Sequence, residues 1–148
     1  MRGMRTVGVL REDTEKRVVE IGVPMGVVAA ILPTTNPTST AIYKTLIALK
    51  AGNAIVLSPH PRARRCTCET AGVLAAAAEK AGAPAGTVEC LGGSTIEGTN
   101  ELMRQADLVV VTGSQTNVRA GYSSGTPALG VGTGNVAVIV DESADCAD

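Results

Sequence analysis

Four short segments contain most of the residues that could take part in chemistry. Each is rich in small polar residues or glycine and follows an apolar run, at 33–36, 58–61, 112–115 and 130–135. In open parallel sheets, ligands bind in the crevice beyond the carboxyl ends of the strands. We therefore expect these four loops to border one binding site.

The first loop, Pro33 to Asn36, lies between an apolar run and a predicted helix. Thr34 and Thr35 would then lie near free backbone N–H groups and a helix dipole, which favour negative charge. The Asn36 amide could donate to the oxygen that becomes negative when a carbonyl is attacked. Asn36 could also simply cap the helix ahead of Pro37, and its position alone favours the cap.

The second and third loops could contact a nucleotide. His60 is the only histidine and lies between Pro59 and Pro61, so it could contact an adenosine ribose or phosphate, or equally be a surface residue. Gly113 and Ser114 follow an apolar run and could allow a pyrophosphate to approach the backbone. Such turns are just as common without a ligand, and neither usual glycine-rich nucleotide fingerprint is present.

The fourth loop has the pattern Gly-x-Gly-x-Gly from Gly130 to Gly134. Because it lies between two apparent strands, its glycines are more typical of tight turns or close backbone packing than of a ligand site. With one histidine in the chain, no catalytic triad can be supported.

The four cysteines, at positions 66, 68, 90 and 146, are predicted to be reduced thiols. Cys66 and Cys68 are too close for easy bridging within a helix. A zinc site of these two with His60 is the alternative, but the spacing fits no standard ligand pattern. We therefore predict no metal.

The composition excludes several classes of protein. The 148 residues have a net charge of −1 and contain two tyrosines as the only aromatic residues. Neither a basic face nor stacking platforms for nucleic acid are present. No apolar stretch resembles a signal peptide or a membrane span, so we expect a cytoplasmic protein without a membrane partner.

Apolar runs alternate with helical segments along most of the chain. Strands are predicted at 17–21, 26–32, 53–58, 87–91, 107–112, 128–131 and 136–140, and helices at 37–51, 61–80, 94–105 and 117–122, the third opened by a capping box from Ser94 to Glu97. The first 16 residues are expected to be a ragged lead-in. This alternation predicts an α/β fold with a doubly wound, mostly parallel sheet. The sequence stops in mid-pattern, so we expect a C-terminally truncated piece of a longer protein.

Two long segments, at 24–63 and 122–145, resemble the CoA-acylating branch of the aldehyde dehydrogenase superfamily. The stretches TTNPTSTAIYK and SPHPRA carry the most specific part of the match, which extends over nearly the whole chain. The resemblance implies a partial Rossmann-like NAD-binding domain over residues 1–148. It also implies oxidation of a small aldehyde with NAD and CoA to acyl-CoA and NADH, in a parent that is a homo-oligomer, cytoplasmic or in a bacterial microcompartment.

By the same resemblance, Asn36 matches the asparagine that stabilises the oxyanion, and Pro33, Thr34 and Thr35 lie beside the nicotinamide. The contacts to the adenosine ribose are assigned to Ser58, Pro59 and His60, and those to the pyrophosphate to Gly113 and Ser114. Val131 and Gly132 are also expected to bind the cofactor. Hydrolytic relatives usually carry a lysine in the 58–60 loop. Its absence here leaves no evident partner for a 2′-phosphate and favours NAD over NADP.

Two positions depart from the hydrolytic pattern. Val118 replaces the closing glycine of a Gly-Ser-Thr-x-x-Gly motif, and Gly130 stands where those enzymes place a general-base glutamate. Without that base, a thioester intermediate would persist until CoA attacks it. A hydrolytic enzyme is therefore the weaker alternative.

The resemblance also implies that the nucleophilic cysteine belongs to a later segment, so that none of the four cysteines fills its place. The catalytic and CoA-binding domain would be absent, and the chain by itself would be inactive. The alternative from another class of protein is a non-catalytic nucleotide-binding module or a degenerate remnant of the family.

Overall fold

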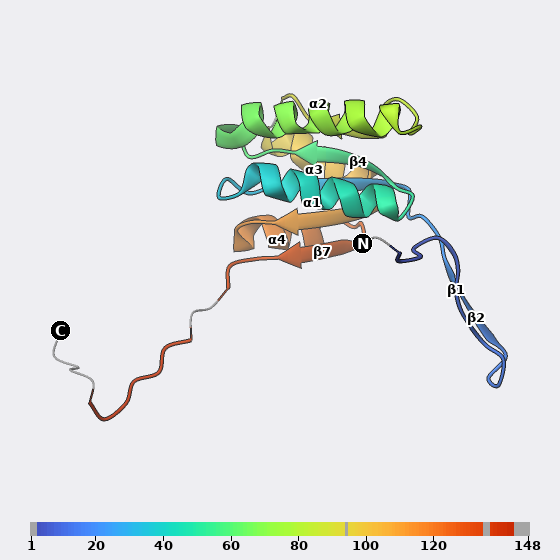
Figure 1. The fold of residues 1–148 in the computed structure, drawn as a ribbon. Helices are drawn as coiled ribbons and strands as arrows, with labels where there is room; N and C mark the ends of the chain where they lie inside the picture. Colours follow the sequence, from blue (N-terminus) through green and yellow to red (C-terminus); the bar gives the residue numbers. More distant parts are fainter. Residues whose placement is uncertain (1–2, 94, 135–136, 144–148) are drawn as a thin grey trace.

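A five-stranded parallel sheet lies between two layers of helices (Figure 1). The structure, a computed structural model, describes residues 3–93, 95–134 and 137–143. The sheet contains β3 (Val27–Ile31), β4 (Ala54–Ser58), β5 (Val88–Cys90), β6 (Leu108–Thr112) and β7 (Ala128–Val131). Helices α1 (Pro37–Lys50) and α2 (Arg64–Lys80) cover one face, α3 (Ile96–Gln105) and α4 (Gln115–Tyr122) cover the other, and a 3₁₀ turn, η1 (Pro61–Ala63), precedes α2. The predicted α/β class with a parallel sheet is confirmed.

The strand order is β5-β4-β3-β6-β7. The chain therefore builds outward from β3 through β4 to β5, then returns across the sheet and continues on the other side of β3 with β6 and β7. A reversal of this kind is a topological switch point, and it opens a crevice at the carboxyl ends of the two strands that flank it. Here those two strands are β3 and β6.

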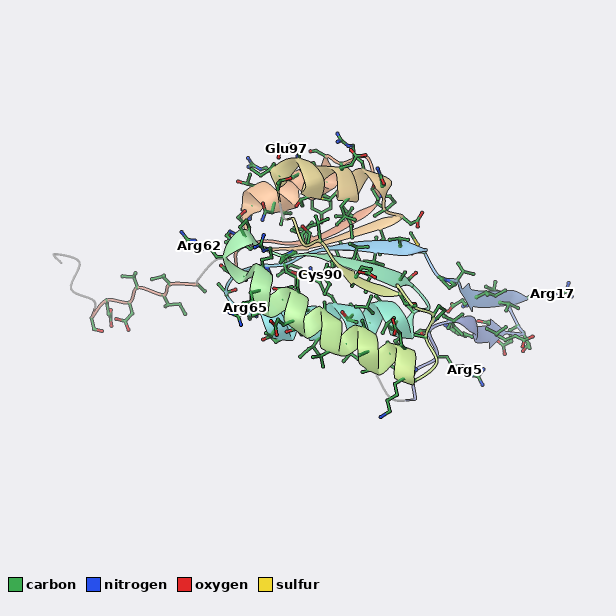
Figure 2. The ribbon with its side chains drawn as sticks, turned by 90° about the horizontal axis from the view of Figure 1, so that it is seen from above. Arg5, Arg17, Arg62, Arg65, Cys90 and Glu97 are labelled. Carbon is green, nitrogen blue, oxygen red and sulfur yellow. A yellow bond between two sulfur atoms is a disulfide. The ribbon has the colours of Figure 1, made fainter. Side chains whose placement is uncertain are left out.

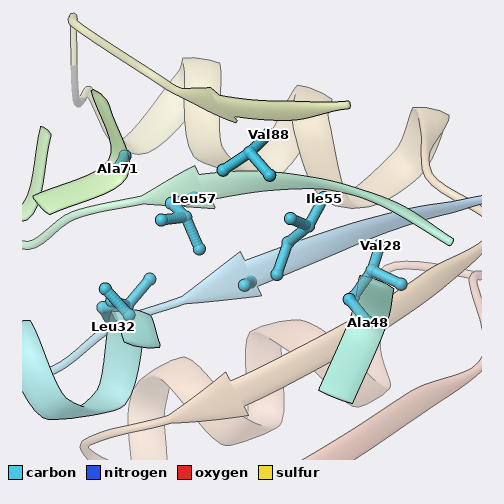
Figure 3. Packing of buried hydrophobic residues seen from close by; sticks show 9 residues of the cluster. Val28, Leu32, Ala48, Ile55, Leu57, Ala71 and Val88 are labelled. Carbon is cyan, nitrogen blue, oxygen red and sulfur yellow. The ribbon is translucent and has the colours of Figure 1, made fainter. Parts of the chain in front are cut away.

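The apolar runs supply both cores because side chains alternate across a strand. Along β3 and the residue after it, Val28, Ala30 and Leu32 face α1 and α2, whereas Ala29 and Ile31 face α3 and α4. Figure 3 shows the first of these clusters, in which side chains of β3, β4 and β5 meet those of the two helices. A strand covered on both faces is apolar throughout, as the sequence predicted.

The N-terminal region differs from the prediction. Residues of the expected lead-in form β1 (Gly8–Asp13), which pairs antiparallel with β2 (Val18–Gly22) in a separate two-stranded sheet. The predicted strand at 17–21 is therefore real but lies outside the parallel sheet. Charged residues within β1, such as Arg11 and Asp13, hid the strand in the sequence because they interrupt its apolar pattern. Figure 1 shows this hairpin projecting from one end of the sheet.

Several element boundaries also differ. Helix α3 begins after Thr95, whose hydroxyl accepts a hydrogen bond from Gly98 N, so the predicted cap at Ser94 was wrong, and Ser94 itself lies outside the described residues. Residues 137–140 are not in a strand, in contrast to the prediction for 136–140, and 135–136 lie outside the described ranges. A strand needs a neighbour to bond to, and no described segment runs beside this one. None of the helices within the described ranges is long and apolar enough to cross a membrane.

The prediction of four reduced thiols was wrong for two of them. Cys68 of α2 and Cys90 of β5 form a disulfide, with their Cα atoms 5.4 Å apart. The sequence argument considered bridges between neighbours along the chain, whereas the fold packs α2 against β5 and brings together two cysteines 22 positions apart. Cys68 is therefore unavailable to the alternative zinc site. Cys66 remains a free, exposed thiol, and Cys146 lies outside the described residues.

Candidate functional site

A cleft of about 950 Å³ opens at the carboxyl ends of the strands, across the switch point. One wall is the loop from Leu32 to Asn36 after β3, and the opposite wall is the turn from Thr112 to Ser114 after β6. The loop from Ser58 to Pro61 after β4 closes one end. Side chains of α3 and α4 and the N-cap residue of α3, Thr95, cover the cleft from one face of the sheet. Those of the two helices include Thr99, Asn100, Met103, Thr116 and Asn117.

The cleft brings together all but one of the residues expected to bind the cofactor or stabilise an oxyanion. Those lining it are Pro33, Thr34, Thr35, Asn36, Ser58, Pro59, His60, Gly113, Ser114 and Gly132. Val131, the last residue of β7, does not line it, and this side chain is 64% exposed. The sequence reasoning missed the contribution of α3, although that helix directly follows β5 and so had to begin at the same edge of the sheet.

Asn36 directly precedes α1, but its side chain caps no backbone N–H group. Instead its Oδ1 accepts hydrogen bonds from the hydroxyls of Thr40 at 3.2 Å and Thr35 at 3.3 Å. The Asn36 amide NH₂ has no hydrogen-bond partner within the described part of the chain. Asn36 is the N-cap residue of α1 with Pro37 in the first turn, as predicted, although its side chain makes no capping hydrogen bond. The amide is left free to donate to a bound oxygen.

The loop after β4 links three elements at one end of the cleft. Ser58 is buried, and its Oγ lies 2.9 Å from Thr99 Oγ1 of α3. His60 Nδ1 accepts a hydrogen bond from the Arg62 backbone N–H. A neutral imidazole that accepts at Nδ1 carries its proton on Nε2, so His60 presents a hydrogen-bond donor there.

Some polar groups of the turn after β6 already form hydrogen bonds within the protein. Gly113 N donates to Val131 O across the sheet at 3.1 Å, so this backbone donor serves β7 and not a ligand. Ser114 is the N-cap of α4, and its Oγ accepts from Asn117 N. The Ser114 hydroxyl proton is still free to donate into the cleft.

Gly130 and Val118, the two positions that depart from the hydrolytic pattern, are in contact with each other. A Cβ atom added to Gly130 would lie 2.7 Å from Val118 Cγ1 and 3.0 Å from the Tyr122 ring. Val118 is buried in α4, and the Tyr122 hydroxyl accepts a hydrogen bond from Gly130 N. A side chain at 130 would therefore enter space that α4 fills. The chain has no glutamate at this position, and the packing leaves no room for one.

Gly130→Ala should lower the free energy of unfolding by about 1–3 kcal/mol, because the added methyl overlaps Val118. Gly134→Ala is the matched control, since nothing lies within 4 Å of its Cβ position, and it should change the stability little. Urea unfolding measures both. Combining Gly130→Ala with Val118→Ala should cost less than the sum of the two single changes, and strict additivity would contradict the contact.

Lys44 of α1 joins the two strands at the switch point. Its side chain is buried, and Nζ donates to Ile31 O of β3 and to Val110 O of β6, each at 2.8 Å. The loops that form the two walls of the cleft start within two residues of these carbonyls. Burial lowers the pKa of Lys44 to about 7, because removing the ammonium from water disfavours its charged form.

The lowered pKa of Lys44 predicts that stability rises with pH. The lysine titrates near pH 7 in the folded chain and near about 10.4 in the unfolded chain. Between these values the unfolded chain binds the extra proton, so the free energy of unfolding should increase with a slope of up to about 1.4 kcal/mol per pH unit. Below pH 7 this contribution is constant.

Urea unfolding between pH 6.5 and 9, on the original chain and on Lys44→Met, measures this effect. The variant should be less stable, since two buried carbonyls lose their donor, and its pH profile should lack the rise. Parallel profiles for the two proteins would show that Lys44 is not the titrating group.

Comparison with known proteins identifies the family. The sequence profile described as "Aldehyde dehydrogenase family" matches residues 2–148. The chain therefore belongs to the aldehyde dehydrogenase family. It is 48% identical over 143 residues to the bifunctional aldehyde-alcohol dehydrogenase of Escherichia coli K12, and this match covers 95% of the chain and 16% of that enzyme.

Solved structures place its relatives in the acylating branch. The crystal structure of an acetylating aldehyde dehydrogenase from Geobacillus thermoglucosidasius aligns with a TM-score of 0.88 and 54% identity, over 90% of the chain and 30% of that protein. Propionaldehyde dehydrogenase from Rhodopseudomonas palustris, solved with bound CoA and an acylated cysteine, aligns with a TM-score of 0.73 and 39% identity, over 76% of the chain and 26% of that protein. The chain thus spans less than a third of the length of these three relatives.

Proposed function

We propose that this chain forms the nucleotide-binding part of an NAD-dependent, CoA-acylating aldehyde dehydrogenase. The proposed overall reaction converts an aldehyde, CoA and NAD⁺ into acyl-CoA, NADH and a proton. The observation that carries the proposal is the cleft at the switch point, which Asn36, with its amide unpaired, lines together with the loops after β4 and β6. Its relatives in the acylating branch support the reaction class.

The residues of the cleft fit a dinucleotide. Its lining combines short polar side chains with apolar ones, and it contains no carboxylate among the described residues to repel phosphates. Bound NAD⁺ would supply a hydride acceptor. The roles of the chain's own residues are to orient that molecule through the 33–36 and 112–114 loops, and to offer the Asn36 amide to the aldehyde oxygen as negative charge develops on it.

The same lining supports thiol transfer over hydrolysis. Activating water needs a general base within hydrogen-bond reach. The described lining of the cleft contains no carboxylate, and its one ionisable side chain is His60, in the loop after β4 at one end of the cleft and away from Asn36 in the loop after β3. Gly130 cannot be replaced by a glutamate without displacing Val118. An acyl thioester formed in such a site would be attacked slowly by water and would wait for the CoA thiol.

We propose that the chain does not complete this reaction by itself. None of Cys66, Cys68 and Cys90 lines the cleft, and two of them form the disulfide. The proposed parent protein supplies the nucleophilic cysteine, uses a small aldehyde, acts in the cytoplasm or in a bacterial microcompartment, and forms a homo-oligomer. That none of these three cysteines lines the cleft also favours the second candidate function, a non-catalytic nucleotide-binding module.

NADH should bind to the purified chain with a micromolar Kd, followed by the fluorescence of the nicotinamide. Thr34→Phe should weaken binding at least tenfold, because it places a ring in the cleft, a change of about 1.4 kcal/mol. Thr38→Phe is the matched control, since Thr38 is exposed on the first turn of α1 but does not line the cleft. Equal binding by the two variants, or no saturable binding by the original chain, would contradict the proposal.

The acylating reaction is tested on a longer chain that continues past Asp148. Aldehyde oxidation should require CoA and yield a thioester, and Asn36→Ala should lower kcat by roughly 10²-fold. Thr38→Ala, outside the cleft, should leave kcat unchanged. Free acid formed equally fast without CoA would favour a hydrolytic enzyme, and no turnover in the longer chain would favour the non-catalytic module.

A further inference from the structure

A disulfide ties the edge strand β5 to α2 at the carboxyl end of the strand. Cys90 is the last residue of β5, and Cys68 lies in the second turn of α2. Figure 2 shows Cys90 next to α2. Both cysteines are only partly buried, so the bond between them is within reach of a small thiol in solution.

The other contacts that hold β5 are few. The strand has three residues and pairs with β4 alone, because it lies at the edge of the sheet. Val88 is its one buried side chain. Directly after the strand, Leu91 N donates to Leu57 O, and Arg64 Nη1 donates to Gly92 O. The disulfide is the only covalent cross-link within the described residues.

The end of β5 leads into one wall of the cleft. Gly92 and Gly93 follow it, and a Cβ atom at either position would have no atom within 4 Å. Without side chains to pack, this stretch can change its direction easily. Helix α3 comes next, and Thr95, Ile96 and Thr99 at its start line the cleft. The place where β5 ends therefore sets the starting point of this wall.

The start of α3 is held weakly by the rest of the fold. Ile96 is 77% exposed, and the one buried side chain of the helix is Met103, in its last turn. Between these positions, Thr99 Oγ1 lies 2.9 Å from Ser58 Oγ. Few buried contacts and an exposed backbone are the marks of a segment that opens locally. The wall formed by α3 thus depends on its connection to β5.

A positive charge lies next to the disulfide. Arg64 is four residues before Cys68, on the same side of α2. Its guanidinium reaches Gly92 O, two residues after Cys90. The attacking species in disulfide exchange is a thiolate anion, which a cation at this place attracts. The surroundings of the bond therefore favour its exchange with thiols.

The proposed chemistry sets the redox conditions around this bond. A nucleophilic cysteine and the thiol of CoA react only in their reduced forms, so the proposed parent protein works where thiols are in excess. Lasting structural disulfides belong to oxidising compartments, whereas a disulfide that meets an excess of thiols exchanges with them. The bond between Cys68 and Cys90 is therefore expected to open and close with the thiol balance.

We propose that the bond between Cys68 and Cys90 is a redox switch that controls nucleotide binding in the cleft. The inference rests on the proposed function, because the ligand whose affinity changes is the dinucleotide. Reduction frees the end of β5 and with it the start of α3. The reduced chain then binds the nucleotide more weakly, because one wall of the site is no longer preorganised.

The reductant is a low-molecular-weight thiol such as glutathione. Its thiolate attacks one sulfur of the bond, the S–S bond breaks, and the other cysteine leaves as a thiolate that takes up a proton. A second thiolate then attacks the mixed disulfide and releases the first cysteine, which is protonated in turn. Two thiols thus supply two electrons and end as one disulfide, and the protein gains two cysteine thiols.

NADH titration of the oxidised and the reduced chain, followed by nicotinamide fluorescence, tests the inference. Reduction by glutathione should raise the Kd about threefold or more, since a preorganised site binds more tightly. Reoxidation with glutathione disulfide should restore the original Kd. A colorimetric thiol assay should find two more thiols in the reduced chain, from the one disulfide.

Cysteine variants locate the effect. Cys90→Ser should bind NADH like the reduced chain and should not respond to glutathione. Cys66→Ser is the matched control, because Cys66 is a free, exposed thiol of the same helix. Two positions along a helix correspond to a rotation of about 200°, so Cys66 faces away from the bond, and its replacement should keep the response. Reduction of the original chain removes the bond without any substitution, so the test does not depend on the folding of Cys90→Ser.

Three outcomes would overturn the inference while leaving the proposed function in place. The first is an equal Kd for the oxidised and the reduced chain. The second is a bond that millimolar glutathione leaves intact in the folded chain. The third is loss of the folded circular dichroism signal on reduction, which would make the bond a staple of the fold. If the chain binds no NADH in either state, the proposed function fails, and the inference fails with it.

Discussion

The hydrogen bonds of one buried ammonium group hold the two walls of the cleft together. Lys44 reaches from α1 across β3 to β6 and donates to a carbonyl of each strand. Beyond this point the chain continues from β3 into the loop with Asn36 and from β6 into the turn with Ser114. Burial disfavours the charged form of this side chain, and its two hydrogen bonds fix the spacing between the strand ends from which the two walls of the cleft begin.

This arrangement explains why the sheet was easier to predict than the interactions at its edge. The apolar runs at β3, β4 and β6 are buried on both faces, and such runs between helices with clear end signals define a parallel sheet almost without regard to the rest of the chain. The sequence could not show that Lys44 is buried, because lysine usually faces water and the apolar residues of α1 are found on both its buried and its exposed sides. Only the packing of α1 over β3 decides this.

The prediction of the site was correct for the grouping of its loops and missed the contacts between its elements. Loops after parallel strands must meet at one edge, so the group around Asn36, His60 and Ser114 followed from the strand assignments. Contacts between elements did not follow. The disulfide between Cys68 and Cys90, the use of Gly113 N by β7, and the fit of Val118 over Gly130 each depend on how a helix or strand lies against its neighbour.

The fit of Val118 over Gly130 also shows that two local departures from a pattern can be one structural event. Either change alone would leave a gap or an overlap between α4 and β7, whereas together they keep the interface filled. The departure at Val118 is thus the packing partner of the departure at Gly130, on which the proposed chemistry depends.

The hairpin of β1 and β2 leaves apolar side chains and unpaired strand edges exposed to water. Apolar side chains on it are exposed, among them Val9, Val18, Val19 and Ile21, at 47–61%. A two-stranded ribbon is marginally stable without further packing, and its open edges are templates for other strands. The chain, whose net charge is low, thus has exposed strand edges in the hairpin and at β7. Both features favour strand-to-strand association between copies of the chain.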